Sequence, residues 1–146
     1  MTQRVRMVAL AMALAVLAAW APGQTRAAED PALRRGRIYY NTGKYAKAIG
    51  ELRTALRRNN RNAEAHRWLG KSYARTSEFD KAIEHLNQAL ELDPRNEEAY
   101  RELGGAYREL AGRARAKGQT EERKQYLAKA DAIAKDLMKL DPKDKE

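Results

Sequence analysis

The stretch AEAHRWLGKSYARTSEFDKAIEHLNQALELDPRN, residues 63–96, decides the fold of this chain. In its first half, Leu69, Gly70 and Tyr73 fall on one stripe of a helix. In its second half, apolar residues recur at steps of three and four, which is the period of an amphipathic helix. Pro94 ends this pattern, because proline supplies no amide hydrogen and disfavours helix in the residue before it. The stretch therefore predicts two helices joined by a turn.

The same pattern recurs every 34 residues along the chain. The residues that mark the period are Gly36, Gly70 and Gly104, together with Tyr39, Tyr73 and Tyr107. A period of this length is that of a helix-turn-helix repeat, whose copies stack so that each buries the apolar face of its neighbour. We therefore predict an all-α solenoid of three repeats, at residues 29–62, 63–96 and 97–142.

The second copy closely resembles the tetratricopeptide repeat (TPR). It supplies the Leu-Gly-x-x-Tyr of that motif, the aromatic residue before the inner alanine, the second alanine and the closing proline. The first copy departs from the motif twice, with Arg35 in place of leucine and Asn60 in place of proline. The resemblance covers residues 29–142 and implies a fold, but it does not specify a partner.

The third copy contains an insertion of 14 residues between its two halves. Seven residues make nearly two helical turns, so an equal addition to each helix would preserve the apolar stripe. Gly118 stands where such a lengthened hairpin would turn. We expect helices near residues 97–117 and 121–140. The alternative is a flexible basic loop between residues 112 and 120.

The first 27 residues have the pattern of a secretory signal peptide. Two arginines precede an uncharged apolar run of 14 residues, 7–20, and no acidic residue occurs before residue 28. The run is shorter than the ~20 residues that a membrane-spanning helix needs. We predict cleavage after Ala27, or as a second choice after Gly23. The expected location is a bacterial periplasm, and the alternative is an uncleaved inner-membrane anchor.

Charge and cysteine content narrow the classes of function. The chain has 29 basic and 20 acidic residues and a formal net charge of +9. Loss of residues 1–27 would remove three arginines and no acids, which leaves a net charge of +6. The remaining basic residues are interleaved with acidic residues. That balance, together with export, argues against nucleic acid as a partner. The chain has no cysteine, so its stability has to come from stacking of the repeats.

The sequence holds no recognisable catalytic arrangement. It lacks the phosphate-binding, dinucleotide-binding and nucleophile-elbow motifs. His66 and His85 are the only histidines; neither has metal-ligand spacing, and we expect both to be exposed. We therefore predict no catalytic residue, no metal site and no cofactor.

The resemblance implies where a partner would bind. In TPR proteins the first helix of each repeat lines a concave groove. The candidate groove residues are Arg34, Arg37, Tyr40, Asn41, Arg67, Trp68, Lys71, Arg75, Arg101 and Arg108. The same positions include Leu33, Glu64, Glu98, Glu102, Gly105 and Glu109. Arginine binds carboxylates bidentately, and aromatic rings anchor apolar side chains. We expect a protein or peptide partner with acidic and apolar side chains, unless the arginines are merely solvated and Trp68 packs on a neighbouring repeat.

One known groove specificity is not expected. Family members that clamp the carboxyl terminus of a chaperone use lysine, asparagine and arginine at set positions. Those positions hold Leu33, Arg37, Trp68, Glu98 and Glu102 in this chain. Only Arg37 keeps a suitable charge, and two of the five positions are acidic.

The leading function is an exported adaptor that binds a partner segment in its groove and helps to assemble an envelope complex. One alternative is a structural protein that self-associates as a homo-oligomer through the elongated hairpin, whose last helix carries an apolar stripe with Ile133 and Leu137. A non-catalytic enzyme subunit would have the same sequence features. Membrane contact is expected if residues 1–27 stay in place as an anchor. The basic hairpin tip, residues 113–117, is otherwise a solvated helix end or a contact for anionic groups.

Overall fold

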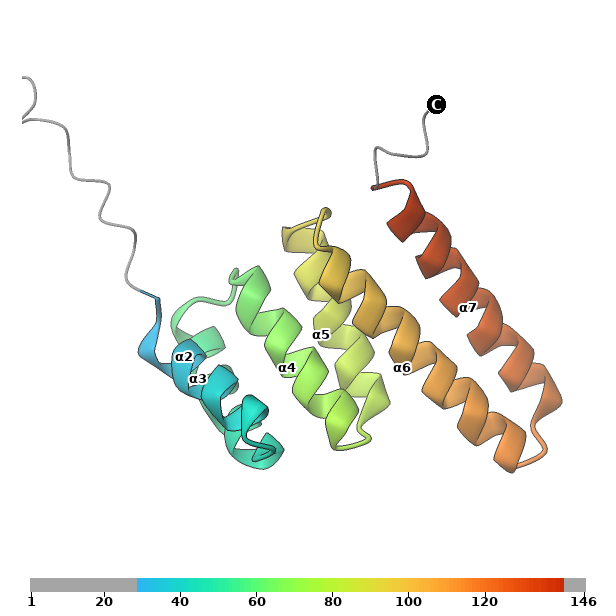
Figure 1. Ribbon diagram of the computed structural model, residues 1–146, viewed down its shortest axis with the longest axis horizontal. Helices are drawn as coiled ribbons and strands as arrows, with labels where there is room; N and C mark the ends of the chain where they lie inside the picture. Colours follow the sequence, from blue (N-terminus) through green and yellow to red (C-terminus); the bar gives the residue numbers. More distant parts are fainter. Residues whose placement is uncertain (1–28, 141–146) are drawn as a thin grey trace, which may run out of the picture.

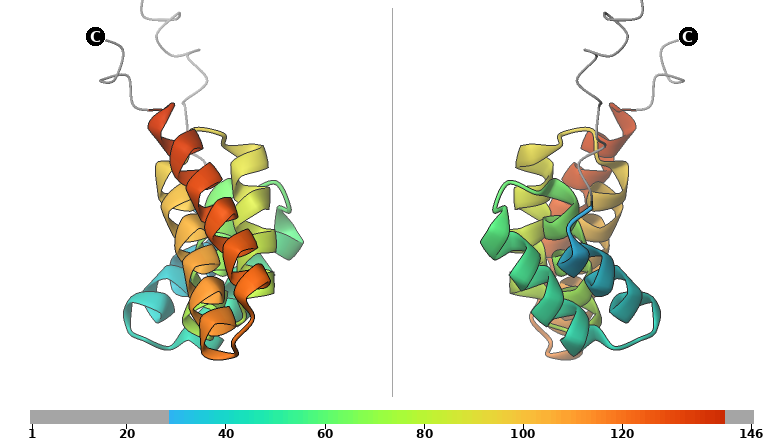
Figure 2. Two further views of the ribbon diagram at one scale, coloured as in Figure 1. Left: turned by 90° about the vertical axis from the view of Figure 1, so that its right-hand side faces the viewer. Right: turned by 90° about the vertical axis from the view of Figure 1, so that its left-hand side faces the viewer.

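The structure, a computed structural model, describes residues 29–140, and this part of the chain folds into six helices without a strand. The helices form three consecutive pairs: α2 (Pro31–Asn41) with α3 (Tyr45–Arg58), α4 (Ala63–Arg75) with α5 (Phe79–Leu92), and α6 (Glu97–Ala116) with α7 (Thr120–Met138). The pairs stack in chain order (Figure 1). In Figure 2, α2 and α6 lie toward one side of the stack, and α3 and α5 toward the other. The predicted all-α solenoid of three helix pairs is confirmed. The predicted signal peptide, residues 1–27, lies outside the described residues.

In each of the first two helix pairs, the helices come closest where a glycine faces a buried leucine. A Cβ atom on Gly36 would lie 2.6 Å from Leu52 Cγ, and one on Gly70 would lie 2.7 Å from Leu86 Cγ. Side chains do not approach that closely, so glycine is what allows the two helix axes to come together. The third pair is looser, because a Cβ on Gly104 would have its nearest contacts at 3.5 Å and beyond.

The core is a row of small and leucine side chains between the helices. A first buried cluster runs from α2 to α5, and a second joins α5 to α6 around Leu86 and Leu103. Leu33 belongs to the first cluster and is 3% exposed. Its expected place in the groove is therefore wrong: Leu33 lies on the inner side of α2, where it packs in the core.

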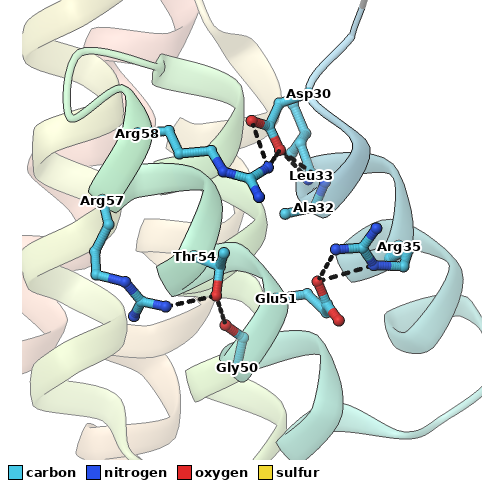
Figure 3. Close-up of polar contacts among 9 residues, drawn as sticks. All are labelled: Asp30, Ala32, Leu33, Arg35, Gly50, Glu51, Thr54, Arg57 and Arg58. Atoms are coloured by element: carbon cyan, nitrogen blue, oxygen red, sulfur yellow. Dashed lines mark hydrogen bonds and ion pairs between the residues drawn. The ribbon is translucent and has the colours of Figure 1, made fainter.

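The polar contacts of the first pair explain one departure from the motif (Figure 3). Asp30 caps α2 by accepting hydrogen bonds from two backbone amides of its first turn, and it also lies 3.2 Å from Arg58 Nη1 of α3. Arg35, which replaces the leucine of the motif, donates to Glu51 Oε2 from Nη2 at 2.8 Å and from Nε at 3.0 Å. An ion pair between α2 and α3 is thus made at the position where the motif has a leucine.

The inserted residues of the third repeat lengthen its helices. α6 has 20 residues and α7 has 19, and only residues 117–119 separate them. Gly118 adopts φ +72° in this turn. Arg113 lies over the ring of Phe79 at 4.4 Å and donates to the carbonyl of Ser77 at 3.4 Å. The added part of α6 therefore packs against the second repeat instead of forming a flexible loop. Within residues 29–140, no helix combines the length and apolar character needed to cross a membrane.

Candidate partner-binding face

The ten candidate groove residues all lie on α2, α4 and α6, whose common surface we call the first-helix face. Helix α4 lies between the other two and packs against both. Six of the candidates meet around it: Arg37, Tyr40, Arg67, Trp68, Lys71 and Arg75. The other four, Arg34, Asn41, Arg101 and Arg108, are exposed and do not join this cluster. Arg101 pairs with Glu97 on its own helix at 2.8 Å.

Acidic residues of the next helix already engage the central cations. Arg37 Nη1 on α2 lies 3.3 Å from Glu64 Oε1 on α4. Lys71 Nζ on α4 lies 3.0 Å from Glu98 Oε1 on α6. Both the cations and the acids of these two pairs are 34 residues apart, so the same ion pair is made twice, once between each pair of neighbouring first helices.

The second of these contacts is part of a larger charged cluster. Lys71 Nζ also lies 3.0 Å from Glu102 Oε1, and the mostly buried Arg67 brings Nη1 to 2.7 Å from Glu98 Oε2, without good hydrogen-bond geometry. Burial alone would lower the pKa of Lys71, but its hydrogen bonds to Glu102 and Glu98 outweigh burial and raise it. Burial would likewise raise the pKa of Glu98, and the bonds to Lys71 with the charge of Arg67 lower it. Both shifts favour the charged forms of Lys71 and Glu98, as expected for an ion pair.

An aromatic row accompanies the cations. The Tyr40 ring lies edge-on between Tyr45 and Trp68, with both ring centroids 5.3 Å away. Arg67 and Lys71 approach the Trp68 ring to 4.8 and 5.2 Å from its centroid. Trp68 is thus held between the first two repeats, with cations over its ring.

A hollow of about 380 Å³ opens in the first-helix face between α4 and α6. It is lined by Ala74, Arg75, Ser77, Phe79, Glu102, Gly105, Ala106 and Glu109. Gly105 stands one period after Lys71 and two periods after Arg37. Apart from the neighbouring residues and the nearby backbone of α6 itself, no atom lies within 4 Å of the place where a Cβ of Gly105 would be. The third repeat therefore leaves open space where the first two extend a long cation.

Sequence reasoning named Gly105, Glu102 and Glu109 as groove positions but chose the basic and aromatic residues as candidates. A comparison of equivalent positions in the three repeats could have indicated the hollow. The series Arg37, Lys71, Gly105 changes from long side chains to none, and this change marks the hollow.

The two histidines were expected to be exposed, and this is wrong. His66 on α4 is 7% exposed, and its Nδ1 lies 3.1 Å from Nδ1 of His85 on α5. His66 Nε2 lies 2.9 Å from the carbonyl oxygen of Asn60. A carbonyl only accepts, so His66 donates from Nε2 and accepts at Nδ1 the proton that His85 donates. Positions 66 and 85 lie on the facing sides of α4 and α5, so the two imidazoles meet between these helices.

The surroundings of the histidine pair disfavour added charge. The Tyr73 ring stacks on His85 at 5.7 Å between centroids. Burial, and then the neighbouring His66, lower the pKa of His85. In the part of the chain that the structure describes, no three His, Cys, Asp or Glu side chains gather in a way that could hold a metal ion.

Consecutive helix pairs that stack on one another define the class of α-solenoid repeat proteins. The chain belongs to the tetratricopeptide repeat family, whose model matches residues 33–97 and 70–136. No curated protein sequence is significantly similar to the chain.

Among solved structures, the chain is similar to TTC0263, a thermophilic TPR protein in Thermus thermophilus, at 29% identity and a TM-score of 0.69. That match covers 76% of this chain and 56% of TTC0263, so the chain spans little more than half of that relative. It is also similar to MamA, at 29% identity and a TM-score of 0.51, over 71% of this chain and 57% of MamA. The second TPR of Spaghetti (RPAP3), solved with the HSP90 peptide SRMEEVD, shares the fold at 20% identity and a TM-score of 0.57, over 75% and 89% of the two chains.

Proposed function

We propose that this chain is an exported adaptor that binds a segment of a partner protein on its first-helix face and helps to assemble a cell-envelope complex. The observation that carries the proposal is the hollow between α4 and α6, which opens beside a row of aromatic and charged side chains. TPR proteins are in general non-catalytic scaffolds, and the RPAP3 domain of the same fold was solved with a bound peptide. Export rests on the pattern of residues 1–27.

The ion pairs change the partner chemistry that we propose. Arg37, Arg67 and Lys71 are each within ion-pair distance of a glutamate of this chain. A partner carboxylate would have to compete with those glutamates. The face is therefore better suited to a segment of mixed charge than to a uniformly acidic one.

Partner capture from an envelope extract of the source organism tests the proposal. Reversing the charge of Arg37, Arg67 or Lys71 would set like charges against the glutamates that join neighbouring helices, so those changes would disturb the fold. Arg34 and Glu109 are exposed and make no ion pair within residues 29–140. The double variant Arg34→Glu with Glu109→Lys alters the first-helix face and keeps the net charge.

A matched control changes the opposite side of the solenoid. Arg53 on α3 and Glu91 on α5 are exposed and likewise unpaired in the described part of the chain, so Arg53→Glu with Glu91→Lys makes the same exchange of charges there. We expect the same partner on the wild type and the control and its loss from the face variant. Equal capture by all three would contradict binding at the first-helix face.

Export is tested separately from binding. Expression of the full chain, followed by fractionation and intact-mass measurement, should give a periplasmic product that begins at residue 28. A full-length product in the membrane fraction would favour the anchored alternative, and one in the cytoplasm would contradict export.

Self-association is a second candidate because α7 exposes apolar side chains. Leu127 is 37% exposed and Met138 is 62% exposed. Concentration-dependent mass that is lost in Leu127→Glu with Met138→Glu would support this role. A constant monomer mass over the accessible concentrations would argue against it.

A further inference from the structure

We propose that the hollow over Gly105 binds a lysine or arginine side chain of the partner segment. This inference rests on the proposed function, since it names the partner chemistry that the first-helix face would select. It reverses the partner charge that we expected from the sequence, because the many arginines on the face had predicted an acidic partner.

Half of the residues that line the hollow suit an alkyl stem. Gly105 adds no side chain, Ala74 and Ala106 add one methyl group each, and Phe79 adds an apolar ring. None of these groups offers a side-chain hydrogen bond. The stem of a lysine or arginine can lie on such a surface while its charged head reaches the rim.

Two carboxylates and one cation line the hollow. Glu102 and Glu109 both line it, and Glu109 makes no ion pair within residues 29–140. Arg75 is the cation in the lining, and its guanidinium is engaged elsewhere. It donates two hydrogen bonds to Tyr45 Oη, at 3.1 and 3.2 Å, and lies over the Tyr45 ring at 5.4 Å. A cationic head entering the hollow therefore meets an unpaired carboxylate.

The face itself shows how such a side chain would be held. Lys71 crosses from α4 with its ammonium 5.2 Å from the Trp68 ring centroid and pairs with Glu98 and Glu102 on α6. Gly105 occupies the equivalent place one repeat later and has no side chain. A cation from the partner would fill this space and continue the alternation of cations and carboxylates along the face.

A phage-displayed library of random nine-residue peptides, selected on the full chain, is the probe. Enriched peptides are synthesised, and their dissociation constants are measured by fluorescence anisotropy on the wild type, Glu109→Lys, Gly105→Lys, Arg34→Glu and the control Glu91→Lys. Glu109 and Gly105 have free space or solvent around them, so circular dichroism should show both variants folded.

We expect the enriched peptides to share one lysine or arginine. Replacement of that residue by norleucine, which keeps the stem and removes the charge, should weaken binding about tenfold. Glu109→Lys should weaken the parent peptide to a similar extent and have little effect on the norleucine peptide, because one contact is removed in both cases. Gly105→Lys should abolish binding by filling the hollow, and Glu91→Lys should change nothing.

Three contrary results are distinguishable. Peptides that bind equally well to the wild type, Glu109→Lys and Gly105→Lys, but are lost with Arg34→Glu, would overturn the lysine site and leave the first-helix face as the binding surface. A selection that enriches no peptide specific for the face would overturn both the site and the proposed function. Enrichment of glutamate or aspartate at the position that Gly105→Lys affects would overturn the assigned charge alone.

Discussion

Each helix pair turns at one residue with a left-handed backbone. Gly43 and Gly118 have φ of +73° and +72°, and the second pair places Ser77 at φ +69°. Ser77 follows Gly43 by one 34-residue period, so the two occupy the same place in the repeat. A residue with a Cβ in this region costs about 1–2 kcal/mol. The second repeat therefore carries a local strain that the glycines avoid in the other two.

Replacing Ser77 by glycine should stabilise the protein. We expect Ser77→Gly to raise the free energy of unfolding in urea by about 0.5–1 kcal/mol, because relief of the left-handed strain exceeds the added entropy of the unfolded chain. The reverse change at the equivalent turn, Gly43→Ser, should lower it by a similar amount. A loss of stability in Ser77→Gly would mean that the serine side chain makes a contact worth more than the strain.

The histidine pair is a contact that the sequence did not reveal, and we expect it to make the stability of the protein depend on pH. One proton lies between the two Nδ1 atoms of His66 and His85, 3.1 Å apart. The pair can therefore keep this hydrogen bond with both rings neutral. A further proton on His85 would place a charge in this partly buried contact, beside His66. The position of the pair between α4 and α5 connects protonation to the packing of the second repeat.

Stability should fall as the pH is lowered through the range in which histidine titrates. The pKa of His85 is below its ordinary value of 6.5 in the folded chain, so the unfolded chain binds this proton at higher pH. The contribution of neutral His85 to the free energy of unfolding is complete above about pH 6.5. It is lost as the pH falls from there to the pKa of His85 in the folded chain. Urea unfolding at about pH 7.5 and 5.5 measures the loss, since carboxylates with lowered pKa, such as Glu98, act below about pH 4.5.

The variant His85→Gln is the control for this prediction. Its amide keeps a donor for His66 Nδ1 and removes one titrating group. We expect the difference in unfolding free energy between the two pH values to shrink. An unchanged difference would assign the pH dependence to groups other than His85.

At the scale of helix pairs, glycine has a structural role in two repeats and a weaker one in the third. Gly36 and Gly70 face leucines that are fully buried, whereas Gly104 faces Ile133 at the longer α6–α7 contact. In the third pair, a more distant isoleucine stands in place of the close leucine of the first two pairs. The three glycines look equivalent in the sequence, but their surroundings differ.

The same substitution should therefore have opposite effects in two repeats. Gly70→Ala should lower the free energy of unfolding by about 1–3 kcal/mol, because its Cβ would lie 2.7 Å from Leu86 Cγ and 3.0 Å from the backbone oxygen of Ala82. Gly104→Ala should leave it unchanged or raise it by up to about 1 kcal/mol through helix propensity. Thermal or urea unfolding of the two variants decides the matter, and equal losses would contradict the difference in packing.

The helices themselves were predictable because the apolar period and the turn residues are local properties. Helices expected near residues 97–117 and 121–140 are found at Glu97–Ala116 and Thr120–Met138. Pairings between helices were not predictable. The sequence shows Lys71 and Glu98 as two groove positions, but their distance of 3.0 Å depends on how far α6 is rotated relative to α4. The contact of the two histidines and the burial of Leu33 depend in the same way on the angle at which helices pack.

At the scale of the whole molecule, buried contacts are concentrated in the middle of the stack. Helix α4 has seven buried residues, α2 has three and α7 has one, Ala130. The core divides into two clusters that meet at α5, where Ala82 belongs to the first and Leu86 to the second. In a solenoid, each helix pair gains stability from its neighbours, and an end pair has a neighbour on one side.

Native-state hydrogen exchange should therefore show a gradient along the chain. We expect the slowest amides in α4 and α5, and amides of α7 that open at a free energy at least about 2 kcal/mol below that of global unfolding. α7 packs mainly on α6 and buries little, so it can separate while the first two repeats stay intact. The measurement is made at two protein concentrations, because self-association through Leu127 and Met138 would slow exchange in α7 as the concentration rises. The amides of α7 could instead exchange only through global unfolding at both concentrations. The elongated hairpin would then be bound to the rest of the solenoid more tightly than its buried residues indicate.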